Sequence, residues 1–166
     1  TPLQQWVLEQ KMTGFLSDAY MFNRLNNYCG QWIRYGDYYP DRKLRLWRRG
    51  VGAWGGYNPH DKYEMPDWAT ITLVKKNLLH WSFVSRAEHV KQMKKFSRIT
   101  AASYFAQHKK ASAVKPFVSA CWTFCKGYFL KLGFLDGKNG WHIAVLNTRY
   151  TYWKYRHLQA LYKGTI

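Results

Sequence analysis

The chain has 166 residues, which suits one domain and lets folding bury about 70% of the surface of the unfolded chain. Apolar residues make up 47% and aromatic residues 19%, a composition that excludes a disordered segment. No uncharged apolar run reaches the roughly 18 residues of a membrane span, so we expect no transmembrane helix. No signal-peptide pattern opens the sequence, which makes the cytoplasm the expected compartment.

The formal net charge of +17 is unevenly distributed. Residues 1–83 contain 11 Lys and Arg against 7 Asp and Glu, whereas residues 84–166 contain 15 against 2. This asymmetry predicts an anionic partner or surface beside the second half. Nucleic acid, anionic lipid and phosphorylated glycan all satisfy it, and charge alone does not distinguish them.

Helical and strand patterns alternate in the first half. Residues 2–13 begin with Pro and end before Gly, which predicts a short helix. Apolar and polar positions alternate in residues 19–28, 31–36 and 42–49, as in antiparallel strands. Residues 69–83 are rich in β-branched and aromatic side chains and predict one or two further strands.

The period changes at Ser85. Ser85 and Glu88 have the spacing of a capping box and open a predicted helix that runs to about residue 110. Residues 114–134 and 141–162 predict two more helices, both basic and rich in aromatic residues. One helical stripe of the middle helix contains Phe117, Cys121, Phe124, Cys125, Tyr128 and Leu132.

These elements predict an α+β fold with antiparallel or mixed strands followed by three amphipathic basic helices. Residues 1–84 form the expected sheet part, and residues 85–166 form the expected helical part.

Titratable residues concentrate in the string "NPHDKYEMPD", directly after a glycine-rich stretch. A general base needs an exposed carboxylate or imidazole, and a divalent metal needs such ligands held by a turn. The alternative is a polar surface loop in which Asn and Asp satisfy turn amides. The four candidates are His60, Asp61, Glu64 and Asp67.

The histidines outside this string have plainer interpretations. His80 follows two leucines and precedes Trp81, a setting more typical of a packed, hydrogen-bonded core residue than of a ligand. Histidines on the predicted helices, among them His89, are most simply surface or interface groups.

The string "YYPDRKLRLWRRG" packs cationic and aromatic residues around one Asp. Strict alternation would place Leu44 and Leu46 on one face and Arg45 with Trp47 on the other. The face with Arg45 is then either a solvated cationic surface or a phosphate site, since guanidinium matches phosphate geometry.

Four strings occur in this order along the chain: "GQWIRYGDYYPDRKLRLWRRG", "NPHD", "LLHWSF" and "GYFLKLGFLDGKNGWHIAVLNTRYTYWKY". Their order resembles the later half of bacterial family 2 glycosyltransferases of the GT-A fold. The subgroup that it resembles most is that of the lipopolysaccharide-core and surface-glycan transferases. The resemblance covers the chain from about Tyr20 to Tyr155.

The resemblance implies roles for particular residues. Asp61, with His60 beside it, matches the position of the catalytic base that deprotonates the acceptor hydroxyl. His80 matches a late histidine that reaches the metal or the donor diphosphate. The donor or acceptor pocket would be bordered by Asp41, Arg45, Gly52, Gly55 and Gly56. The cationic strand would thus serve phosphorylated sugars.

The implied reaction is transfer of a sugar from a nucleotide-sugar donor, with inversion, to a lipopolysaccharide-core or other surface-glycan acceptor. In such enzymes a nucleotide-binding βαβ half and a D-x-D motif for Mg²⁺ or Mn²⁺ precede this region, and no D-x-D occurs in this sequence. We therefore expect the chain to be the C-terminal portion of an enzyme and to be inactive alone.

The basic helices predict a peripheral location on the inner face of the cytoplasmic membrane, because basic and aromatic side chains together suit anionic headgroups. The alternative is that these aromatics pack the helices onto the sheet. The cations assigned to the membrane surface are Lys126, Lys131, Arg149, Lys154 and Arg156.

Two other classes of function compete with a transferase. A nucleic-acid-binding module would also use basic and aromatic residues, but the sequence has no zinc, RNP or helix-turn-helix pattern, and such a module leaves Asp61 without a role. We therefore expect no nucleic acid as a partner. A membrane-associated scaffold would make the site residues incidental.

Overall fold

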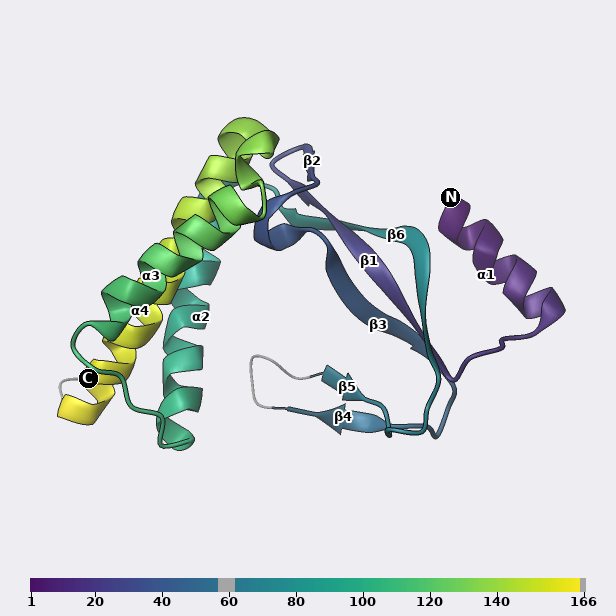
Figure 1. Cartoon of the computed structure of the whole chain (residues 1–166), viewed down its shortest axis with the longest axis horizontal. Coiled ribbons are helices and arrows are strands. Elements are labelled where there is room, and N and C mark those ends of the chain that lie inside the picture. The colour runs from purple at the N-terminus through teal and green to yellow at the C-terminus, as the bar shows by residue number, and fades with distance from the viewer. Residues whose placement is uncertain (57–61, 165–166) are drawn as a thin grey trace.

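The computed structural model describes residues 1–56 and 62–164 and has an α+β fold, as the sequence predicts. A sheet part occupies one end of the molecule and a helical part the other (Figure 1). The sheet part comprises α1 (Pro2–Thr13), β1 (Ala19–Tyr28), β2 (Gln31–Ile33), the 3₁₀ turn η1 (Gly36–Tyr38), β3 (Asp41–Trp47), β4 (Ala53–Gly55), β5 (Lys62–Glu64) and β6 (Ile71–Phe83).

The helical part begins directly after β6. It comprises α2 (Arg86–Ala106), α3 (Lys115–Phe124), the π-helical turn η2 (Cys125–Leu130), the 3₁₀ turn η3 (Gly133–Asp136) and α4 (Gly137–Lys163). No helix in residues 1–56 or 62–164 is long and apolar enough to cross a membrane.

β1 is the central strand of the main sheet. β3 pairs antiparallel with the first half of β1, and β2 pairs antiparallel with the last residues of β1. β6 runs parallel to β1 along the whole length of β1. β4 and β5 form a separate antiparallel hairpin. The side of β1 that carries Tyr20, Phe22, Arg24, Asn26 and Tyr28 is here called the inner face.

The inner face is covered at its two ends. Tyr20 and Phe22 make edge contacts with Trp6 of α1, with ring centroids 5.3 and 5.7 Å apart. At the other end, Tyr28 packs in a buried cluster with Phe83 and with Ile143 of α4. Because α1 and the helical part cover opposite ends, the polar middle of the inner face remains accessible.

A β-bulge corrects the predicted alternation of β3. Tyr20 pairs with Leu46, but its neighbour Met21 pairs with Leu44, so Arg45 is the extra residue of the bulge. Paired residues share a face and successive β1 residues do not, so Leu44 and Leu46 lie on opposite faces. Leu46 joins the apolar cluster on the inner face.

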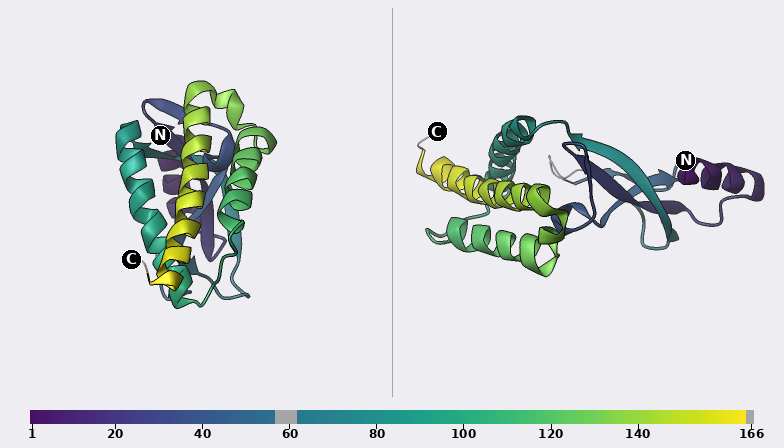
Figure 2. Two further views of the ribbon diagram at one scale, coloured as in Figure 1. Left: turned by 90° about the vertical axis from the view of Figure 1, so that its left-hand side faces the viewer. Right: turned by 90° about the horizontal axis from the view of Figure 1, so that it is seen from above.

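The helices α2, α3 and α4 form one layer with α4 in the middle (Figure 2). α3 meets α4 through small and aromatic side chains: Ala120 is buried, the hydroxyl oxygens of Thr123 and Thr151 lie 3.2 Å apart, and the Phe117 ring lies edge-on against Tyr152. The predicted stripe of α3 divides between two surfaces: Phe124 and Tyr128 contact Trp141 of α4, whereas Cys121 and Cys125 are exposed.

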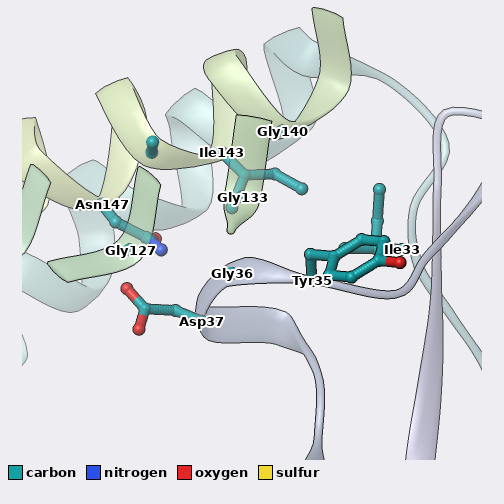
Figure 3. A pocket seen from close by; sticks show the side chains of 10 residues that line it. Ile33, Tyr35, Gly36, Asp37, Gly127, Gly133, Gly140, Ile143 and Asn147 are labelled. Atoms are coloured by element: carbon teal, nitrogen blue, oxygen red, sulfur yellow. The ribbon is translucent and has the colours of Figure 1, made fainter. Parts of the chain in front are cut away.

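Glycines join the helical part to η1 (Figure 3). A Cβ at Gly127 would lie 2.8 Å from Oδ2 of Asp37, and one at Gly133 would lie 2.6 Å from the carbonyl oxygen of Gly127. A Cβ at Gly140 would overlap the carbonyl oxygen of Gly133. The string "GYFLKLGFLDGKNG" therefore builds a close backbone contact that holds η1 in place.

Asp136 secures the same junction. Its buried carboxylate accepts hydrogen bonds from the backbone N–H of Arg34, at 3.1 and 3.2 Å, and from that of Tyr35, at 2.8 Å. The side chain of Gln31 also donates to the Asp136 carbonyl at 3.1 Å. The beginning of α4 is thus tied to the end of β2.

His89 is part of the core, which corrects its predicted surface position. Its exposed fraction is 0%, and its ring stacks on Phe83 with centroids 4.2 Å apart. Its Nδ1 is 3.1 Å from the Tyr28 hydroxyl and its Nε2 is 3.0 Å from the Tyr38 hydroxyl. A neutral imidazole satisfies both contacts, because one nitrogen donates and the other accepts.

Acid should destabilise the fold through His89. Burial lowers the pKa of His89 from 6.5 to about 4, so between these values the unfolded chain binds more protons than the folded chain. The free energy of unfolding should therefore fall by roughly 3 kcal/mol as the pH is lowered from about 6.5 to about 4. Denaturant titrations across this range, with NMR of the His89 ring, measure it. A ring that becomes protonated near pH 6.5 would contradict the assignment.

Candidate functional site

A polar pocket of about 410 Å³ lies on the inner face of the sheet, between its covered ends. Side chains from five segments line it, and most of them are charged or are hydrogen-bonding groups. They are Arg24 and Asn26 of β1, Asp37 and Tyr38 of η1, Asp41 and Lys43 of β3, His80, Ser82 and Phe83 of β6, and Gln92 of α2.

The sequence of β1 explains where this pocket forms. Its inner-face residues change from aromatic, at Tyr20 and Phe22, to polar, at Arg24 and Asn26. Parallel pairing places His80 beside Asn26, and antiparallel pairing places Asp41 beside Arg24. Three strands therefore bring their polar residues to one place.

Asp41 orients two cations of the pocket. Arg24 donates from Nε to Oδ2 of Asp41 at 2.8 Å, and its Nη2 lies 2.6 Å from the same oxygen. Lys43 Nζ lies 3.1 Å from Oδ1 of Asp41. Two cations share one carboxylate, so this group keeps one positive charge in excess, which favours an anionic ligand such as phosphate.

The hydrogen bonds of His80 define its tautomer. The Ser82 hydroxyl donates to Oδ1 of Asn26 at 2.8 Å, which uses its only proton. His80 Nδ1 lies 3.0 Å from that amide oxygen and 3.0 Å from the Ser82 oxygen, so Nδ1 faces two acceptors. Nδ1 therefore carries the proton, and Nε2 of the neutral ring keeps its lone pair.

The charge state of His80 is also set by its surroundings. Burial, and to a smaller extent the cations of Arg24 and Arg45, lowers the pKa of His80, whereas Asp41 opposes the shift. The ring is thus neutral at pH 7. A neutral ring with a lone pair on Nε2 accepts a hydrogen bond from a hydroxyl or binds a metal, but it does not attract a bare diphosphate.

The pocket wall is linked to the buried core. Asn26 Nδ2 donates to the carbonyl oxygen of Tyr38 at 2.8 Å, and the Tyr38 hydroxyl meets His89. Burial raises the pKa of Tyr38 well above its ordinary value, so its hydroxyl remains protonated. Sequence reasoning did not identify Asn26, Ser82 or Tyr38, because their roles depend on pairing between distant strands.

The structure brings together two of the predicted site residues. Asp41 and His80 both line the pocket. Arg45 does not line it: the bulge leaves Arg45 exposed, with Nη1 donating to the carbonyl oxygen of Leu44 at 3.3 Å. The predicted catalytic pair, His60 and Asp61, lies outside the described residues.

The predicted pocket glycines lie in or beside the β4–β5 hairpin. A Cβ at Gly52 would overlap the carbonyl oxygen of Glu64, and one at Gly55 would lie 2.7 Å from the Glu64 carboxylate. Gly56 follows β4 in a left-handed conformation with φ of 94°. Tyr63 of β5 stacks on Trp47 of β3 with centroids 4.1 Å apart, which fixes the hairpin to the sheet.

The five predicted membrane-surface cations separate into two groups. Lys131 pairs with Asp37 at 2.8 Å and so helps to dock η2 on η1. Lys154 is half-buried, lies 4.7 Å from the ring centroid of Tyr155, and has a pKa lowered by burial and by the charges of Lys109 and Lys115. Both contribute to internal packing. Lys131 is exposed despite its ion pair, and the other exposed members are Lys126, Arg149 and Arg156.

The pocket does not form a metal centre by itself. In residues 1–56 and 62–164, no three His, Cys, Asp or Glu side chains are placed to hold one ion. The Asp41 carboxylate is occupied by Arg24 and Lys43, so His80 is the one pocket residue described here with a nitrogen ready for a metal. A catalytic Mg²⁺ or Mn²⁺ would need most of its ligands from elsewhere.

Comparison with known proteins does not assign the pocket to a family. No protein-family model matches the chain, and no solved structure gives a significant match.

Proposed function

We propose that this chain is the C-terminal, acceptor-side portion of an inverting glycosyltransferase. The observation that carries the proposal is the pocket on the inner face of the sheet, where a cationic pair lies beside a neutral imidazole, an amide and a hydroxyl. Cations suit the phosphate groups of a nucleotide sugar or a phosphorylated glycan, and neutral hydrogen-bonding groups suit sugar hydroxyls. The resemblance to family 2 glycosyltransferases supports this choice.

The pocket residues have distinct proposed roles. Arg24 and Lys43, held by Asp41, bind an anionic group of the substrate. His80 accepts a hydrogen bond from a sugar hydroxyl through Nε2 or provides a single ligand to the metal of the complete enzyme. Asn26 and Ser82 hold the His80 ring in place through Nδ1.

Asp61 is the proposed catalytic base, on the strength of the resemblance. Its carboxylate would accept the proton of an acceptor hydroxyl while that oxygen attacks the anomeric carbon of the donor. The bond between the anomeric carbon and the diphosphate oxygen breaks, and its electron pair leaves with the diphosphate. One displacement of this kind inverts the anomeric centre.

The remaining parts of the enzyme are proposed to lie elsewhere in the gene product. A nucleotide-binding half with a D-x-D motif would hold the donor base and a divalent metal. The proposed acceptor is a lipopolysaccharide core or another surface glycan, which places the enzyme on the inner face of the cytoplasmic membrane. The chain described here should not transfer sugar alone.

The proposal is tested by donor turnover with the complete gene product. Release of nucleoside diphosphate is measured over a panel of nucleotide sugars, with membrane extract as acceptor and with Mn²⁺ or EDTA. We expect release from at least one donor that depends on Mn²⁺, and none from the 166-residue chain. A folded gene product that releases nothing from any donor, or a 166-residue chain that transfers sugar, would overturn the proposal.

A further inference from the structure

The outer surface of α3 and η2 exposes large apolar side chains. The exposed fraction is 64% for Val118 and 59% for Trp122. This surface, called the α3 face below, consists of Val114, Phe117, Val118, Trp122, Phe129 and Leu130.

The α3 face is not needed to close the helical layer. α3 already packs against α4 through Ala120 and Thr123, and Phe117 lies at the edge of the α3 face, where its ring also touches Tyr152 of α4. In Figure 2, α3 lies at one edge of the layer, with α4 covering one side of it. A contiguous apolar surface of this kind on a folded domain marks a binding site.

The charges around the α3 face identify the kind of partner. No charged residue lies between Lys115 and Lys126, so the centre of the face is apolar. Acidic residues are absent from the sequence between Glu88 and Asp136. Asp136 is buried, and its carboxylate accepts hydrogen bonds from the backbone. The exposed cations in residues 109–138, apart from Lys131, which pairs with Asp37, are called the rim and are Lys109, Lys110, Lys115, Lys126 and Lys138.

This arrangement favours an anionic bilayer over other partners. An apolar centre enters the boundary between headgroups and acyl chains, while lysines at the rim meet anionic headgroups. Val114, Val118 and Leu130 have no rings on which nucleic acid bases could stack. A second copy of the chain is also disfavoured, because two such faces would bring their lysine rims together.

We propose that the α3 face inserts into the surface of an anionic membrane, with α3 lying in the plane of the interface. This inference deepens the membrane location included in the proposed function, but it does not depend on the transfer reaction. In this arrangement the lysines of the rim contact the headgroups, in place of Lys131, which pairs with Asp37, and Lys154, which is half-buried.

Flotation of the 166-residue chain with vesicles tests the proposal. The chain should bind vesicles of phosphatidylcholine and phosphatidylglycerol far more strongly than vesicles of phosphatidylcholine alone. Trp122→Ser should lower the partition coefficient about tenfold. The matched control is Trp68→Ser, since Trp68 is 70% exposed in the turn before β6 and should have no effect.

Two further measurements separate insertion from simple adsorption of a basic protein. Lys126→Gln should weaken binding about fivefold, and more than Lys75→Gln, which removes the same charge from β6. Lipids brominated in their acyl chains should quench the wild type, and Trp122→Phe should remove most of that quenching. Circular dichroism checks that each variant is folded.

Several results would overturn the proposal. One is vesicle binding that Trp122→Ser and Trp68→Ser reduce equally, or that neither reduces. Another is binding that salt abolishes completely and that shows no quenching by brominated lipid. A third is oligonucleotide binding that depends on Trp122 when vesicle binding does not, since this would identify the face as a nucleic-acid site.

Discussion

Gly140→Ala should lower the free energy of unfolding by roughly 3 kcal/mol, a large fraction of the 5–15 kcal/mol that stabilises a typical domain. In an ordinary helix the same change stabilises by up to about 1 kcal/mol, because alanine is the better helix former. In α4, however, the added Cβ would overlap the carbonyl oxygen of Gly133. Backbone cannot yield as a flexible side chain can, so η3 and α4 must move apart.

A matched substitution separates this clash from the general cost of replacing glycine. Gly50→Ala makes the same chemical change at a residue with φ of 82° and no atom within 4 Å of the new Cβ. It should cost about 1 kcal/mol for the left-handed conformation. Urea denaturation of the wild type and both variants provides the comparison. Equal losses for the two variants would show that the junction in Figure 3 is not closely packed.

Asp61→Asn should reduce sugar transfer by the complete gene product about a thousandfold, since the variant lacks the proton acceptor. Asparagine keeps the size of the side chain, so KM for the acceptor should change little. Steady-state kinetics of transfer measure both quantities.

The control for Asp61→Asn is Asp67→Asn, in the same acidic cluster of the sequence. Asp67 is exposed in the turn before β6 and has no proposed part in the reaction, so its variant should retain wild-type kcat. If Asp61→Asn also retained full kcat, Asp61 would not be the base, and a binding function would become the better account.

Local patterns predicted most of the fold. The alternation in residues 19–28 and the proline and glycine that bound residues 2–13 matched β1 and α1, because these signals act within one element. The spacing of Ser85 and Glu88 predicted the start of α2, where the Ser85 hydroxyl accepts from the Glu88 N–H. These signals do not depend on distant parts of the chain.

The errors arose where distant segments meet. The bulge at Arg45 depends on how β3 pairs with β1, so strict alternation misplaced Leu44 relative to Leu46. His89 looked like a surface residue because its two tyrosine partners come from β1 and η1. The apolar stripe of α3 gave no sign that it divides between α4, where Phe124 and Tyr128 contact Trp141, and the exposed surface, where Cys121 and Cys125 lie.

Only part of the candidate pocket could be predicted, because the pocket also forms where distant segments meet. His80 and Asp41 were identified through the resemblance, and the structure places both in one pocket. Arg24, Asn26 and Ser82 were missed, because a polar residue in a strand is unremarkable until its partner strands are known. Gly52 and Gly55, also assigned through the resemblance, lie at the β4–β5 hairpin, where an added Cβ would meet Glu64.

The proposed function requires that the pocket around His80 is the site of the reaction. The most direct measurement is kcat/KM for nucleoside diphosphate release by the complete gene product, for the wild type, His80→Gln and the control His142→Gln on α4. We predict a loss of about a hundredfold for His80→Gln and less than about twofold for His142→Gln. Unchanged kcat/KM in a folded His80→Gln variant would contradict the claim and place the reaction outside this pocket.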